Sequence, residues 1–120
     1  MCIDAENEKE ILRFLKEDPA RIKKFRQIVN LLIEGIRNTE LYDKEDIDSG
    51  CKDVTAMKMF KKGQNIRLYC KEQKGPLGTY YIIVSELLKK KKSQKNGNTE
   101  KTLIKKVSNY DYEIKERPEE

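Results

Sequence analysis

The spacing of apolar residues changes its period part-way along this chain, and that change limits the folds that the chain can adopt. Between residues 8 and 38 apolar side chains recur every three or four positions, as on one face of an amphipathic helix. From Val54 onward they tend to alternate with polar residues, as in a strand with one buried face. Helices followed by strands predict an α+β fold.

The helical part predicts two helices joined by a very short turn. The first should run from Glu8 to Glu17. Asp18 is a good N-cap and Pro19 suits a first helical position, so the second should run from Pro19 to about Asn38. Two helices joined so closely should form an antiparallel hairpin. The apolar stripe of the second helix consists of Ile22, Phe25, Val29, Leu32, Ile33 and Ile36.

The rest of the chain predicts a loop, a small sheet and a last helix. The acidic segment from Thr39 to Asp53 is expected to be a loop, and Met1 to Ala5 carry only a hint of a strand. A helix should run from Thr99 to about Ile114. Three strands joined by short turns should form an antiparallel meander: Val54 to Phe60, Asn65 to Glu72 and Thr79 to Leu88.

Length and composition predict a single domain with a basic surface. The 120 residues suffice for one core, with a helical hairpin and acidic loop in residues 1–53 and a basic sheet and terminal helix in residues 54–114. The net charge of +5 favours a polyanionic partner such as RNA, although solvated lysines alone would also explain it. Three cysteines without motif spacing fit a reducing, cytoplasmic location, and no apolar run predicts a membrane span.

The chain contains no histidine, and this restricts its chemistry. Histidine is the commonest general acid–base group and the commonest metal ligand, so Ser-His-Asp, Cys-His and histidine-based metal sites are excluded. We therefore expect no metal and no cofactor. Any catalysis must use lysine, arginine, tyrosine or carboxylate.

Several basic and tyrosine residues could converge on a site for metal-free RNA cleavage. Such cleavage needs deprotonation of the 2′-hydroxyl, stabilisation of the phosphorane and protonation of the leaving oxygen. Arg67 suits phosphate stabilisation, Lys58 with Lys91 or Lys92 suits proton transfer and charge stabilisation, and Tyr110 or Tyr112 could assist. A tyrosine among cations would be acidified. The lysines expected to contact RNA are Lys61, Lys62, Lys89, Lys90 and Lys95.

Each of these residues also has a simpler interpretation. A mid-strand arginine is more often a structural ion-pair partner than a catalyst. A run of lysines is usually solvated or docks an acidic peptide. Tyr110 and Tyr112, near the chain end, could simply cap a core.

Three short segments stand out, residues 63–69 (GQNIRLY), residues 91–96 (KKSQKN) and Ala56-Met57-Lys58. They resemble motifs of the RelE/ParE toxin superfamily, especially its HigB-like branch. Residues 63–69, GQNIRLY, are similar to that family's "G-x-x-I/Y-R-V-x-Y" strand. Residues 91–96, KKSQKN, resemble its "V-K-K-T-Q-K-T" segment, and Ala56-Met57-Lys58 resembles its "E-L-R" strand with Lys58 at the arginine position. The chain departs from the family in its short first strand, in Ala56, in the missing histidine and in the extra Lys89-Lys90.

The resemblance implies a RelE-like fold and a toxin of a type II toxin–antitoxin pair. Members of the RelE- and HigB-like branches are ribosome-dependent, metal-independent endoribonucleases, or mRNA interferases, that cut mRNA in the decoding site. The implied partners are a cognate antitoxin, the ribosome and mRNA, with no membrane and no small-molecule cofactor. Two alternatives remain: an inactive RelE-fold module that binds RNA or protein, and a ParE-like inhibitor of gyrase.

Overall fold

A mixed β-sheet is the centre of the fold. The computed structural model describes residues 1–36, 38–45, 49–59, 66–75, 78–88 and 98–113. Within these residues five strands form one sheet in the order β1-β5-β4-β3-β2. β1 runs parallel to β5 and the remaining neighbours are antiparallel. The strands are β1 Cys2–Ile3, β2 Tyr42–Lys44, β3 Val54–Lys58, β4 Arg67–Lys74 and β5 Tyr80–Leu88.

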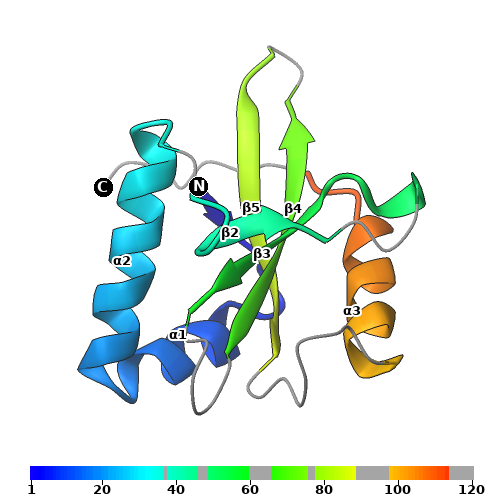
Figure 1. Cartoon of the computed structure of the whole chain (residues 1–120). Coiled ribbons are helices and arrows are strands. Elements are labelled where there is room, and N and C mark those ends of the chain that lie inside the picture. The colour runs from blue at the N-terminus through cyan, green and yellow to red at the C-terminus, as the bar shows by residue number, and fades with distance from the viewer. Residues whose placement is uncertain (37, 46–48, 60–65, 76–77, 89–97, 114–120) are drawn as a thin grey trace.

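Helices cover both faces of this sheet. Figure 1 shows α2 (Pro19–Ile33) on one side of the strands and α3 (Asn98–Ser108) on the other, with α1 (Glu8–Lys16) at the lower end of α2. As expected from the sequence, Asp18 caps α2, because its side chain accepts a 2.9 Å hydrogen bond from the amide of Ala20. The α+β class is therefore confirmed. The meander of β3, β4 and β5 is also confirmed, but it makes up only part of a larger mixed sheet.

The predicted antiparallel hairpin of helices is wrong in its geometry. α1 and α2 contact each other, but Figure 1 shows α1 meeting the start of α2 obliquely instead of lying alongside it. α1 instead directs Ile11, Phe14 and Leu15 onto the sheet, where they are almost fully buried. Burial of these side chains against the strands decides its direction more than the short turn does.

α2 ends at Ile33, earlier than the predicted Asn38, and a glycine explains the difference. Gly35 has a φ of +73°, a left-handed conformation that glycine adopts without a Cβ penalty. The amide of Gly35 donates to the carbonyl of Leu32 and the amide of Ile36 to that of Leu31. These two bonds form a Schellman motif, which closes the helix.

The acidic segment before β3 is more ordered than a loop. Within it, Tyr42–Lys44 forms β2, which pairs antiparallel with β3, and Ser49–Cys51 forms a 3₁₀ turn. The prediction of a loop is therefore wrong for these residues. A three-residue strand that contains an aspartate and a lysine has too little apolar alternation to stand out in a sequence.

The buried side chains form two clusters, one on each face of the sheet, where the sequence predicts one core. Alternation along β4 is confirmed: Leu68 and Cys70 face α1 and α2, whereas Arg67, Tyr69 and Lys71 face α3. We call these the α1/α2 face and the α3 face. The cluster of the α1/α2 face includes Ile11, Phe14, Leu15, Ile28, Met57, Leu68 and Val84, and that of the α3 face Val54, Ala56, Tyr69, Ile104 and Val107.

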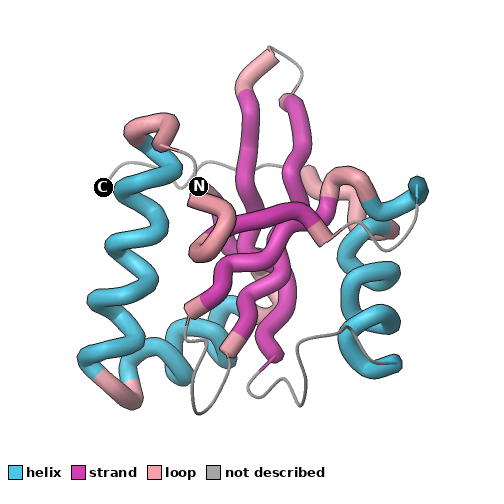
Figure 2. The backbone as a smooth tube through the Cα atoms, viewed as in Figure 1, coloured by secondary structure: helices cyan, strands magenta, loops and turns pink. Residues whose placement is uncertain are grey.

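The last helix is shorter than predicted. α3 ends at Ser108, and the following residues up to 113 lie as a loop against the strands, coloured pink in Figure 2. Ile114, the predicted helix end, lies outside the described residues. No helix in the described part of the chain is both long and apolar enough to cross a membrane.

Candidate functional site

Lys58 and Arg67 lie side by side at one end of the sheet. They are cross-strand partners of β3 and β4, and Leu88 is the partner of Arg67 on β5. Alternation from Ala56 and Tyr69 puts both basic residues on the α3 face, as the sequence predicts. Neighbouring strands are about 4.8 Å apart, so the ends of β3 and β5 are separated by about 10 Å with Arg67 between them.

Arg67 is buried in a setting of mixed charge. Only 4% of the residue is exposed. Burial lowers the pKa of its guanidinium, and the neighbouring Tyr69 and Glu45 oppose that change. Glu45 and Glu100 are themselves buried, and both contribute to the raised pKa of Tyr69 after its own burial. The carboxylate of Glu45 close by weakens the attraction of Arg67 for a distant phosphate.

Two polar atoms in this cluster lack a hydrogen-bond partner in the described part of the structure. They are Nε of Arg67 and the hydroxyl of Tyr69. Buried polar groups are normally satisfied by protein or ordered water, so these atoms have spare capacity to bind. The guanidinium of Arg67 otherwise reaches its nearest carbonyl, that of Ile66, at 3.4 Å. Because Arg67 is almost fully buried, an RNA phosphate could contact it only after neighbouring protein groups move aside.

Lys58 is directed away from Arg67. Its Nζ donates to the carbonyl of Thr39 at 3.2 Å, at the start of the segment that forms β2. The side chain is partly exposed, unlike that of Arg67. Lys58 is therefore the member of this pair that solvent or a ligand can reach directly.

The other predicted lysines lie outside the described residues. Lys61 and Lys62 follow the end of β3, and the run of Lys89, Lys90, Lys91, Lys92 and Lys95 follows the end of β5. Both segments thus begin beside Arg67, at the same end of the sheet.

Tyr110 and Tyr112 bind carboxylates, not cations. The hydroxyl of Tyr110 donates to Glu86, which also pairs with Lys106 at 3.3 Å. The hydroxyl of Tyr112 donates to Asp4 at 2.5 Å. Burial, followed by these bonds to carboxylates, raises the pKa of both tyrosines. Both hydroxyls therefore keep their protons at neutral pH, and the acidification expected of a tyrosine among cations does not apply to them.

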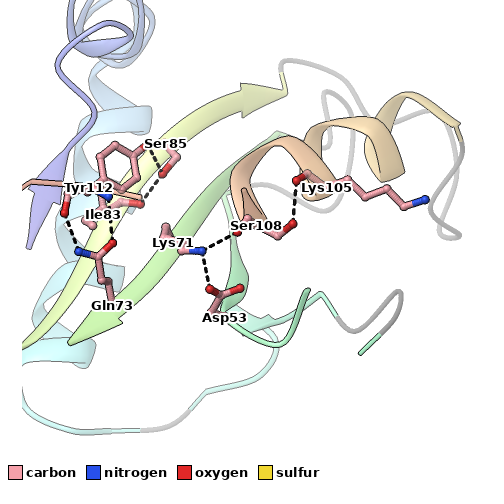
Figure 3. A network of polar contacts seen from close by, with 8 residues as sticks. All are labelled: Asp53, Lys71, Gln73, Ile83, Ser85, Lys105, Ser108 and Tyr112. Atoms are coloured by element: carbon pink, nitrogen blue, oxygen red, sulfur yellow. Dashed lines mark hydrogen bonds and ion pairs between the residues drawn. The ribbon is translucent and has the colours of Figure 1, made fainter. Parts of the chain in front are cut away.

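A polar network that sequence reasoning missed fastens the chain end to the sheet. Figure 3 shows Lys71 between Asp53 and Ser108: its Nζ lies 2.5 Å from the carboxylate and 2.7 Å from the backbone carbonyl. Next along β4, the side chain of Gln73 both donates to and accepts from the backbone of Tyr112. One sequence feature could have indicated part of this network: the alternation of β4 places Lys71 on the same face as Arg67.

The serine at a β-bulge completes this network. Pairing of β4 with β5 shifts register between Tyr69 and Cys70, which leaves Ser85 as the extra residue. Ser85 is fully buried, and its Oγ lies 2.9 Å from the hydroxyl of Tyr112. The two tyrosines also stack edge to face, with ring centroids 5.5 Å apart. In this structure both tyrosines therefore serve to hold the chain end in place.

Comparisons with known proteins do not identify a family. No family model matches the sequence, and neither a search of curated proteins nor a search of solved structures returns a match. Among the described residues, no group of three or more cysteine, aspartate or glutamate side chains is arranged to hold a metal ion.

Proposed function

We propose that this chain binds RNA at the end of the sheet marked by Lys58 and Arg67, and that it is a RelE-like toxin that cuts mRNA on the ribosome. The observation that supports this most is the register of the three central strands. Because Lys58, Arg67 and Leu88 are neighbours, both lysine-containing connections leave the sheet at one place. Clustered lysines attract the phosphate backbone independently of base sequence.

The layout of the elements gives further support. A short parallel first strand, two helices and an antiparallel meander occur in that order. α1 and α2 lie on the face of the sheet opposite to that of Lys58 and Arg67. Under this proposal the chain acts in the cytoplasm on the ribosome and mRNA, and a cognate antitoxin covers its basic end. Arg67 would clamp phosphate, and Lys58 with Lys91 or Lys92 would move protons.

Binding is tested by the salt dependence of affinity for single-stranded RNA. Each phosphate contact contributes a slope of about −0.7 to the plot of log affinity against log salt. Lys58→Gln should reduce the slope by about that amount, while Lys16→Gln, an exposed lysine on α1, should leave it unchanged. RNA binding without salt dependence, or an equal effect of the two variants, would contradict the proposal.

Cleavage is tested separately on translating ribosomes. Expression of the wild-type chain should arrest growth, and mRNA should be cut only when ribosome-bound. Arg67→Ala is expected to relieve both effects, but its burial requires a check of folding by circular dichroism. Lys58→Gln avoids that ambiguity because Lys58 is partly exposed.

A second candidate function, binding of RNA or an acidic protein without cleavage, is favoured by two observations. Arg67 is buried beside the carboxylate of Glu45. The hydroxyls of Tyr110 and Tyr112 keep their protons and donate hydrogen bonds to Glu86 and Asp4. Salt-dependent binding with intact mRNA would identify this function. A DNA supercoiling assay would separate the third possibility, a ParE-like gyrase inhibitor, from both.

A further inference from the structure

A pocket on the α1/α2 face has chemistry that the proposed function does not use. Its volume is about 340 Å³, within the range of small-molecule sites. Residues at the end of α2, including Leu32, Gly35 and Ile36, form one wall. The floor comes from the sheet, where Thr55 of β3 and Glu72 of β4 lie beneath the opening.

A chain of hydrogen bonds ends at a carboxylate on this floor. The hydroxyl of Thr55, a residue only 1% exposed, donates to the hydroxyl of Tyr42 at 2.6 Å. The hydroxyl of Tyr42 in turn donates to Glu72 at 2.7 Å, and Tyr80 also bonds to Glu72. Burial raises the pKa of both tyrosines, with Glu72 adding to the effect, so both hydroxyls keep their protons and act as hydrogen-bond donors.

Among the described residues that line the pocket, the balance of charge is opposite to that of the whole chain. Glu72 and the half-buried Asp43 are negative, and the exposed Lys44 is positive. α2 ends at the pocket, and the C-terminal end of a helix carries a partial negative charge. These contributions together favour a cation, although the chain has a net charge of +5.

The walls are apolar and partly aromatic. Ile36 is 49% exposed and Tyr80 54% exposed, which is unusual for such large side chains and leaves hydrocarbon and ring surface at the opening. Aromatic faces attract cations, and aliphatic walls favour a hydrocarbon stem. We propose that this pocket binds a small organic cation, a primary alkylammonium, with its charged group on Glu72 and its stem between Ile36, Ile82 and Tyr80.

The experiment uses n-butylammonium as the probe, with n-butanol as its neutral counterpart, and measures affinity by NMR titration of the full chain. Butylammonium should bind about tenfold more tightly than butanol, since a charge-assisted hydrogen bond replaces a neutral one. Glu72→Gln keeps the shape and the acceptor for Tyr42 but removes the charge, so it should abolish that preference. Glu86→Gln is the matched control, because Glu86 also accepts from a tyrosine but lies on the α3 face.

A second variant tests the proposal even if Glu72→Gln fails to fold. Lys44 is exposed at the opening of the pocket, so Lys44→Gln should fold normally and tighten butylammonium binding about twofold, with no effect on butanol. The proposal is overturned if butylammonium binds no better than butanol. It is also overturned if the folded Glu72→Gln variant binds like Glu86→Gln, or if Lys44→Gln leaves the affinity unchanged.

Discussion

Tyr112→Phe should destabilise the fold, because the hydroxyl of Tyr112 joins both ends of the chain to the sheet. It donates to Asp4, just after β1, and contacts Ser85 of β5 at 2.9 Å. A hydrogen bond to a charged group contributes about 1.5–3 kcal/mol and a neutral one about 0.5–1.5 kcal/mol. Asp4 keeps two backbone donors, the amides of Glu6 and Asn7, which reduces the loss. The net cost should be about 2 kcal/mol.

Urea unfolding followed by circular dichroism measures this cost. In a chain of this size, about 2 kcal/mol corresponds to a fall in Tm of roughly 6–10 °C. Tyr110→Phe is the matched control, since it removes a hydroxyl that also donates to a carboxylate on the α3 side. Glu86 keeps Lys106 as a partner at 3.3 Å, so the control should cost about 1 kcal/mol or less.

Equal stability of the two variants would refute this reasoning, and so would a Tyr112→Phe variant within about 0.5 kcal/mol of the wild type. The same pair of variants bears on the proposed catalysis. If Tyr112 acts only through the fold, any loss of RNA cleavage by Tyr112→Phe should follow its loss of stability and recover at lower temperature. A loss of cleavage at full stability would instead assign it a direct role.

Two other predictions concern the backbone at the end of α2 and the buried tyrosines. Gly35→Ala should lower the Tm by about 3–5 °C, because a Cβ at φ +73° costs about 1 kcal/mol although it meets no atom within 4 Å. Gly35→Asn should cost less. A rise in Tm for the alanine variant would contradict the left-handed conformation assigned to Gly35. Burial raises the pKa of Tyr42 and Tyr69, so below pH 10 both folded and unfolded chains hold these protons, and above it only the unfolded chain releases them. Stability should therefore be lost as pH rises above 10, by about 1.4 kcal/mol per pH unit for each of these tyrosines. If tyrosinate absorbance from these two residues appeared while the chain was still folded, their pKa values would not be raised and the prediction would fail.

The elements that follow a long apolar pattern could be predicted from the sequence. β4 alternates over eight residues, so the faces taken by Arg67 and Leu68 follow directly from its pattern. The end of α2 was predictable in principle, because Gly35 is a common helix terminator, yet the apolar stripe continues through Ile36 and obscures it. β2 was not predictable, since three residues carry too little pattern and its pairing with β3 supplies the order.

The surroundings of the candidate site could not be predicted, because its contacts join distant parts of the chain. Tyr112 and Asp4 are 108 residues apart in sequence, and no local pattern indicates that they meet. Glu45 and Glu100 both act on Tyr69, although one precedes it and the other follows it by more than 20 residues. Sequence reasoning therefore found the basic residues but not the carboxylates beside them.

The positions of charged residues along β4 change how the net charge of the chain should be interpreted. β4 begins with Arg67 on the α3 face and carries Glu72 on the opposite face, about 17 Å further along the strand. Salt at physiological strength screens solvent-accessible charges beyond about 8 Å, so the partly exposed Lys58 at the basic end does not cancel the acidic pocket. A net charge of +5 therefore describes neither site. Under the two proposals, one strand serves an anionic ligand at one end and a cationic ligand at the other, and the two binding events should be independent of each other.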